Sequence, residues 1–186
     1  MNKKLIFAGA AAAIAATAAY LYTRAGKVSM PKGAEAVKDF EVEKYLGTWY
    51  EIARLDYKFE RNLSNVTAHY SLDEKGQVVV DNKGFNYKKG KWLESVGKAK
   101  FVGDPHEARL KVSFWGPIWN GYNVIAIDAD YQHALVVGDD KNYMWILSRN
   151  KRIPKHVKQS FLLKASSLGY DVNDLTWTKH RNMHVA

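Results

Sequence analysis

The residue types that most often carry out catalysis or bind metals are few in this sequence and are not grouped. Its six histidines are scattered along 186 residues, and His180 and His184 lie close to the C-terminus. His69 and His133 fall at outward strand positions or near turns, so no three histidines converge as a metal site requires. No G-x-S-x-G motif, phosphate-binding loop or dinucleotide fingerprint is present. The pattern predicts neither a metal centre nor a cofactor.

One pair of residues could do acid/base chemistry. Asp128 and Tyr131 lie close together in the sequence, as a proton-transfer pair would require. The chain contains no cysteine, which excludes disulfides, thiolate metal sites, thiol catalysis and cysteine-linked lipid anchors together. No other catalytic set is visible, and we expect a protein that is not an enzyme.

The composition is that of a folded chain with a modest positive charge. Hydrophobic residues make up 47% and aromatic residues 13%, too many for a disordered chain. Lys and Arg outnumber Asp and Glu by 28 to 19, and four of the nine excess charges lie in residues 1–28. The rest are spread along the chain, unlike the concentrated patch of a nucleic-acid-binding protein. They would suit an anionic membrane surface or ligand headgroup.

The N-terminal segment has the pattern of an exported protein. Two lysines precede an uncharged run of 18 residues that ends at Tyr22. Residues 1–24 therefore form either an uncleaved membrane anchor, which we favour, or a signal peptide cleaved near Ala16–Ala18. Either places the remainder outside the cytoplasm. Residues 25–40 read as a short linker, and residues 41–186 as the folded domain.

From Gly47 onward, strand-like runs alternate with turns. In the clearest run, 66–72, apolar residues alternate with polar ones, which is typical of a half-buried strand. Strands connected by hairpins, with no helix between them, close most easily into an antiparallel up-and-down barrel that has no edges. We expect eight strands, at residues 48–56, 66–72, 77–87, 92–102, 108–114, 122–128, 132–138 and 143–149.

One helix is expected after the eighth strand. Pro154 suits a first helical position, and Gly169 can end the helix. An apolar stripe at helical spacing would pack against the barrel wall; it consists of Val157, Phe161, Ala165 and Leu168. Residues 175–178 form a short final strand. The predicted fold class is therefore all-β: an eight-stranded barrel, one C-terminal helix on its wall and a last strand.

Three motifs resemble those of the lipocalin family: Gly47-Thr48-Trp49; Ala126-Ile127-Asp128 followed by Tyr131; and Trp145 to Arg149. Three further runs resemble the bacterial outer-membrane lipocalins related to apolipoprotein D: Trp49 to Arg54, Lys111 to Phe114 and Gly121 to Ala126. The resemblance covers residues 41 to about 180. It implies a lipocalin barrel that binds lipid, and it implies that Asp128 and Tyr131 are structural rather than catalytic.

The order of the strands places the motifs at one end of the barrel. Successive connections alternate between the two ends, so the turns at 73–76, 103–107 and 129–131 share an end with Trp49 and Arg149. We call this end the floor and expect the Arg149 guanidinium to cover the Trp49 indole, a contact worth about 0.5–2 kcal/mol. The predicted structural floor consists of Gly47, Trp49, Asp128, Tyr131 and Arg149.

The other end of the barrel, which we call the mouth, carries aromatic rings and lysines. The connections 57–65, 88–91, 115–121 and 139–142 lie there, and the set would suit an amphiphile with an anionic head. Alternation points small side chains inward, which leaves room for one ligand. The candidate ligand-binding residues are Ala68, Tyr70, Val80, Asn82, Trp92, Gly97, Ala99, Phe101, Leu110, Val112, Phe114, Trp119 and Tyr122. Glu51 is either a buried acid or turned to solvent by a bulge.

Two function classes remain. The first is a lipid-binding protein of the bacterial cell envelope, facing the periplasm, that stores or transports fatty acyl lipids or lysophospholipids for membrane maintenance. The second is an interaction module with a filled barrel that docks a membrane or protein partner through its aromatic and basic rim. The resemblance implies the outer membrane and allows a homodimer. Without the lipoprotein cysteine, an inner-membrane anchor or a soluble periplasmic form is the other expectation.

Overall fold

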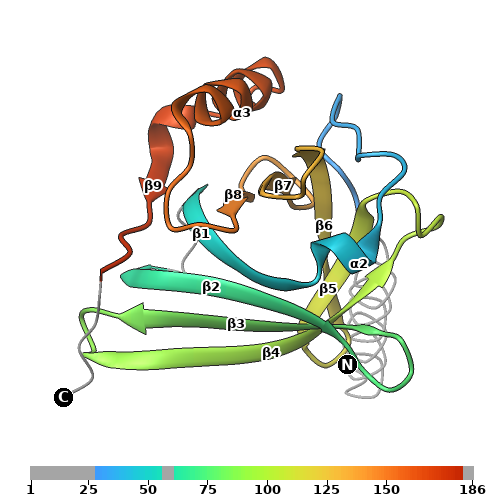
Figure 1. Ribbon diagram of the computed structural model, residues 1–186, viewed down its shortest axis with the longest axis horizontal. Coiled ribbons are helices and arrows are strands. Elements are labelled where there is room, and N and C mark those ends of the chain that lie inside the picture. Colours follow the sequence, from blue (N-terminus) through green and yellow to red (C-terminus); the bar gives the residue numbers. More distant parts are fainter. Residues whose placement is uncertain (1–27, 56–60, 182–186) are drawn as a thin grey trace, which may run out of the picture.

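A computed structural model describes residues 28–55 and 61–181. Eight antiparallel strands close into a barrel, and one helix and a short strand lie outside it (Figure 1). The elements are α2 (Val42–Tyr45), β1 (Gly47–Leu55), β2 (Leu63–Leu72), β3 (Val78–Asn86), β4 (Lys91–Phe101), β5 (Arg109–Trp115), β6 (Ile118–Ile127), β7 (His133–Val137), β8 (Met144–Ser148), α3 (Lys155–Ser167), the 3₁₀ turn η1 (Val172–Asp174) and β9 (Leu175–Trp177). This architecture confirms the predicted fold class.

Strand β1 closes the barrel because it pairs with a different strand along each part of its length. Its first half pairs with β2, with Trp49 opposite Ala68. Its second half pairs with β8, through a register shift between Glu51 and Ala53. Beyond that shift the outer edge of β1 also pairs with β9, where Ala53 lies opposite Trp177. The order β2 to β8, then β1, therefore returns to β2.

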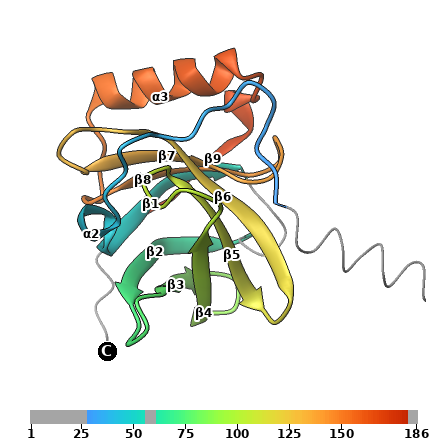
Figure 2. The same cartoon turned by 90° about the vertical axis from the view of Figure 1, so that its right-hand side faces the viewer.

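Two apolar clusters follow from this arrangement. One fills the floor half of the barrel and includes Trp49, Tyr70 and Val136. The other lies between the barrel wall and α3, where Phe161 and Ala165 of the helix are buried against residues of β6, β7 and β8. Figure 2 shows α3 lying across the outside of the barrel. The apolar stripe that predicted the helix is the face that it buries.

Two connections differ from the sequence prediction. The mouth loop expected at 115–121 is a tight turn at Gly116 and Pro117, because β5 and β6 extend to Trp115 and Ile118. The end of the segment expected to be a linker packs on the barrel, since Phe40 is buried and the Val37 amide donates to the Val124 carbonyl at 2.9 Å. The predicted anchor or signal peptide, residues 1–24, lies outside the described residues.

The floor is held by the Arg149 side chain at the end of β8. Its guanidinium carbon lies 4.0 Å from the centroid of the Trp49 ring. Its N–H groups donate to four carbonyl oxygens: Lys44 at 2.8 Å, Leu46 at 2.8 Å, Thr48 at 3.0 Å and Tyr131 at 3.3 Å. Trp49, fully buried, donates from Nε1 to the Tyr45 carbonyl at 2.8 Å. One cation thus joins β8 to α2, to β1 and to the β6–β7 turn.

Replacing Arg149 tests this role. Arg149→Ala should lower the free energy of unfolding by about 1–3 kcal/mol, because the cation–π contact and the donors to the floor carbonyls are lost together. Urea unfolding measures the change, and Arg152→Ala, which removes an exposed arginine nearby, serves as the control. Ligand affinity of the folded protein should be unchanged. Wild-type stability combined with lost binding would place Arg149 at the ligand instead.

Candidate ligand-binding cavity

The barrel encloses a cavity above the floor. The space free of protein atoms within the cavity and in the open solvent next to it is about 900 Å³. Most of the lining is apolar, and among the described residues no Lys, Arg or His contributes to it. The lining consists of Phe40, Val42, Tyr45, Leu46, Glu51, Val66, Thr67, Ala68, Tyr70, Val78, Val80, Asn82, Ala99, Leu110, Val112, Phe114, Tyr122, Trp145 and Leu147.

Nine of the thirteen residues proposed from the sequence line this cavity. They come from five strands, because alternation sends every second side chain of each strand inward. Register agrees with this, since Ala68 lies opposite Asn82, and Ala99 opposite Val112. The nine are Ala68, Tyr70, Val80, Asn82, Ala99, Leu110, Val112, Phe114 and Tyr122. Their contact with a ligand remains a prediction.

Gly97 and Phe101 point inward but do not reach the cavity. A Cβ on Gly97 would lie 2.7 Å from both the Phe114 ring and the Ser113 carbonyl oxygen, so the glycine allows Phe114 to cover this part of β4. Phe101 packs edge-on against Phe40 with ring centroids 6.4 Å apart, and it belongs to the floor. Both residues shape the cavity from behind its lining.

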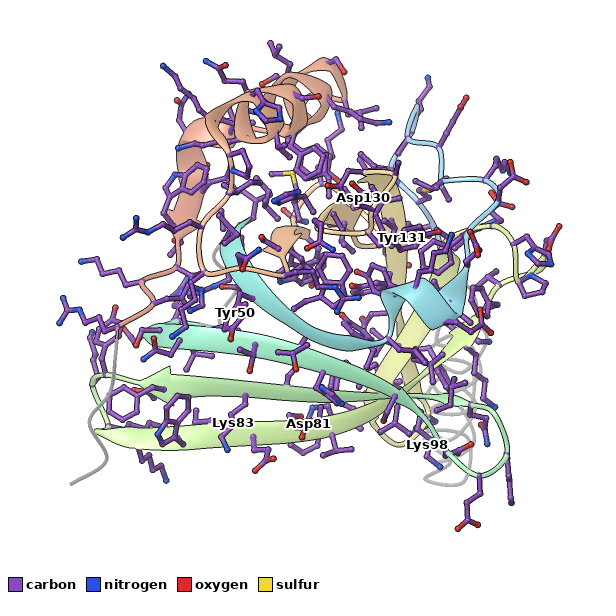
Figure 3. All side chains as sticks on the ribbon, in the orientation of Figure 1. Tyr50, Asp81, Lys83, Lys98, Asp130 and Tyr131 are labelled. Atoms are coloured by element: carbon purple, nitrogen blue, oxygen red, sulfur yellow. The ribbon has the colours of Figure 1, made fainter. Side chains whose placement is uncertain are left out.

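Trp92 and Trp119 lie on the outer surface rather than around the cavity. Trp92 packs edge-on against Phe85, at 5.6 Å between centroids, under the Lys83 ammonium at 5.7 Å. Trp119 lies beneath Lys111 and Lys100, whose Nζ atoms are 5.2 and 5.7 Å from the ring centroid. Both are strand residues of outward parity, not loop residues free to turn inward. Lys83 is labelled on the β3–β4 wall in Figure 3.

Three phenols line the floor side of the cavity. The Tyr122 hydroxyl lies 2.6 Å from that of Tyr45 and 2.7 Å from that of Tyr70, so the three form a hydrogen-bonded chain. Burial raises the pKa of all three hydroxyls. They therefore stay neutral and offer polarity without charge. Tyr45 comes from α2, a four-residue helix that the sequence did not reveal; its only signal was the apolar spacing of Val42, Tyr45 and Leu46.

The one acid of the lining is neutralised. Glu51 Oε1 accepts a hydrogen bond from Arg54 Nη1 at 2.6 Å, and both side chains are almost fully buried. Thr178 Oγ1 also donates to Glu51, and Arg54 Nη1 donates to Thr178 at 3.2 Å. The bulge after Glu51 therefore leaves it buried, one of the two arrangements expected from the sequence. The Glu51–Arg54 ion pair is part of the cavity wall, and its hydrogen bonds to Thr178 connect β1 to the chain that follows β9.

Asp128 and Tyr131 form the β6–β7 turn and do not line the cavity. The Asp128 carboxylate accepts hydrogen bonds from the Gln132 amide at 2.6 Å, the His133 amide at 2.9 Å and His133 Nδ1 at 2.8 Å. Tyr131, with φ +53°, accepts the Glu41 amide at its hydroxyl, 2.9 Å away, and lies beside α2 (Figure 3). Both side chains are hydrogen-bonded within the floor, so neither Asp128 nor Tyr131 is available as an acid or base for a reaction.

Other chemistry is not supported in the described residues. They hold no group of three or more His, Asp or Glu side chains that could bind a metal. Within the same residues, no helix is long and apolar enough to span a membrane.

An eight-stranded barrel with one closed end and an apolar cavity is the architecture of a lipocalin. The family model described as a lipocalin-like domain matches residues 40–180. The outer membrane lipoprotein Blc of Escherichia coli strain K12 is 51% identical over 165 residues, which are 89% of this chain and 93% of that protein. Mouse apolipoprotein D is 31% identical over 186 aligned positions, 90% and 93% of the two chains.

The chain belongs to the lipocalin family, in the bacterial group related to Blc and apolipoprotein D. The structure of insecticyanin from Manduca sexta shows the same fold at a TM-score of 0.65, with 19% identity over 84% of this chain and 89% of that one. As a lipocalin, the chain is a binding protein and not an enzyme.

The Asp128 turn predicts a pH effect on stability. Burial alone would raise the pKa of Asp128, but the hydrogen bonds from His133 and Gln132 outweigh it and hold the pKa below its usual value. A pKa that is lower in the folded state stabilises the fold at neutral pH, and this stabilisation is lost as the pH falls below about 4.

Asp128→Asn should therefore lower stability at pH 7 and flatten its fall on acidification. Urea unfolding across pH 7 to 2 measures both, with the exposed Asp130→Asn as the control. Parallel curves for Asp128→Asn and wild type would contradict the role of this carboxylate.

Proposed function

We propose that this lipocalin binds one fatty acyl lipid, a fatty acid or a lysophospholipid, with its chain inside the barrel, and that it stores or transports such lipids in the cell envelope. The observation that carries the proposal is the mostly apolar cavity inside the barrel, above a floor closed by Arg149 and Trp49. The similarity to bacterial outer membrane lipoproteins supports a place in the cell envelope, where we propose that the barrel faces the periplasm.

The energy of this binding comes from removing the acyl chain from water. Burying roughly 14 methylenes at about 0.8 kcal/mol each gives about 11 kcal/mol. Ordering the chain and losing its translational freedom offset part of this. About 8 kcal/mol remains, which corresponds to micromolar affinity.

The distribution of charge favours entry of the acyl end of the lipid. A headgroup anion inside the cavity would find neutral phenols and a carboxylate already paired with Arg54, and no free cation among the described lining. Burying such a charge unpaired is costly. At the mouth, by contrast, the β3–β4 turn exposes Lys88, Lys89 and Lys91. The chain therefore enters first, and the head stays near these lysines.

A second function remains as the alternative, an interaction module with a filled barrel. The outward placement of Trp92 and Trp119 favours it, because neither ring is available to a ligand in the cavity. Delipidation followed by mass spectrometry of what rebinds distinguishes the two. A barrel that stays empty and takes up no fatty acid would favour the interaction module.

Filling the cavity tests the proposal directly. Val112→Trp should abolish binding of a fluorescent fatty acid, because the new indole occupies the cavity lined by Val112, Leu110 and Phe114. Val96→Trp, the same change at an exposed outward position of β4, should bind as wild type does. Circular dichroism verifies both folds. Wild-type affinity in a folded Val112→Trp protein would show that the lipid does not enter the barrel.

The lysines of the β3–β4 turn should act on capture rather than on residence. Changing Lys88, Lys89 and Lys91 together to Gln should slow association with an anionic lipid at low salt, and the difference should fade as salt shortens the screening length to about 8–10 Å. Stopped-flow fluorescence gives both rate constants. The matched control changes Lys75, Lys155 and Lys164, also exposed, to Gln. If both triple variants slowed association equally, the slowing would come from the lower net charge of the protein and not from the lysines of the β3–β4 turn.

A further inference from the structure

The described chain begins at the mouth of the barrel. The Ser29 amide donates to Asp139 Oδ1 at 2.7 Å, and its hydroxyl donates to the Asp139 carbonyl at 2.8 Å. Asp139 Oδ2 also accepts the Gly121 amide at 2.7 Å. A Cβ on Gly121 would lie 2.9 Å from both Asp139 Oδ1 and the Ser29 carbonyl, so a glycine is required there. Because Asp139 lies in the β7–β8 connection, Ser29 is fastened at the mouth.

From Ser29 the chain crosses the barrel to the floor. Figure 2 shows this segment, in blue, running from the side opposite α2 to α2 itself. Ser29 lies seven positions after Tyr22, where the uncharged run of the predicted anchor ends. An extended chain of that length spans at most about 25 Å. A membrane segment at residues 1–24 would therefore be joined to the barrel at its mouth.

Two hairpin tips at the mouth expose large apolar side chains. On the β5–β6 turn, Trp115 is 77% exposed and Ile118 56% exposed. On the β3–β4 turn, Tyr87 is 57% exposed and Trp92 43% exposed. Tryptophan and tyrosine are the residues enriched at membrane–water interfaces. Several such side chains at one end of a barrel are more than the scattered exposure of an ordinary surface.

The turns at the two ends differ in charge. The three floor turns, within residues 73–76, 102–108 and 128–132, contain six acids and a single lysine, although Lys44, Arg149, Lys151 and Arg152 lie at the same end outside these turns. The β3–β4 tip has three lysines and no acid. The two acids of the β7–β8 connection accept local hydrogen bonds, Asp139 from Ser29 and Gly121 and Asp140 from the Asn142 amide. An anionic lipid surface attracts each nearby Lys and repels acids. Such a surface would therefore orient the barrel mouth first.

We propose that the barrel docks with its mouth against an anionic phospholipid surface, with the β3–β4 and β5–β6 tips at the interface. The cavity then opens toward the bilayer, so that an acyl chain can pass from the bilayer into the cavity, or back, without crossing water. This last step rests on the proposed lipid-binding function; the docking itself rests on the tips, the charges and the place of Ser29.

The absence of cysteine from the sequence makes the test direct, since one introduced cysteine is the single thiol. Pro117→Cys places a label at the β5–β6 tip, and Glu74→Cys places one at the floor. The full chain carries a fluorophore at either site and is bound to vesicles of phosphatidylcholine containing phosphatidylglycerol and a quencher-bearing lipid. We expect at least threefold stronger quenching at residue 117 than at residue 74 per bound protein. Equal quenching, or stronger quenching at residue 74, overturns the proposal.

Variants separate docking from lipid uptake. Changing Trp115 and Ile118 together to Ser should remove the excess quenching at residue 117, whereas Leu72→Ser, at a 42% exposed floor position, should preserve it. Vesicles without phosphatidylglycerol should also reduce the excess. Val112→Trp should preserve it; its loss there would mean that the signal came from lipid in the cavity, and the proposal would fail. Excess quenching in the wild-type protein, combined with no fatty-acid binding by that same wild-type protein, would sustain the docking and overturn the proposed function alone.

Discussion

The stack of Arg149 on Trp49 is the constraint on which the rest of the structure depends. The guanidinium covers the indole and bonds to carbonyl oxygens of the α2 segment, the start of β1 and the β6–β7 turn. Residues 44–48 lie far in the sequence from the β6–β7 turn and from Arg149, yet all three share one end of the barrel. Closing the sheet and covering its floor are therefore coupled, and a cavity open at only one end is the result.

Above that floor, the described residues that line the cavity are polar in places but carry no free charge. Burial keeps the three phenols neutral, and Arg54 neutralises Glu51. A buried ion pair is weak evidence for stability. Here it joins β1 to the chain after β9 through Thr178. In the proposed function, this interior takes the uncharged acyl chain and the mouth takes the headgroup. Selectivity for the chain and capture of the head would then belong to different ends of one barrel.

Strand alternation and three motifs predicted the barrel and most of the cavity lining, because burial of a period-two pattern leaves little choice of face; helical spacing predicted α3. Trp92 and Trp119 were expected at the mouth, Trp92 at the start of a strand and Trp119 in a loop. Instead β4 and β6 extend through them and fix their parity outward. The α2 segment was missed because four residues carry too little periodicity, and their helix is stabilised by contacts with Trp49 and Arg149. Tertiary contacts, not local pattern, decide such pieces.

The central claim is that an acyl chain lies inside the barrel, and isotope-filtered NMR tests it most directly. A ¹³C-labelled fatty acid bound to the unlabelled protein should show nuclear Overhauser contacts from its chain methylenes to the methyl groups of Val80, Leu110 and Val112, which line the cavity. Contacts confined to the exposed tip residues Trp115 and Ile118 would contradict the account, since the lipid would then lie on the outside of a barrel that never admits it.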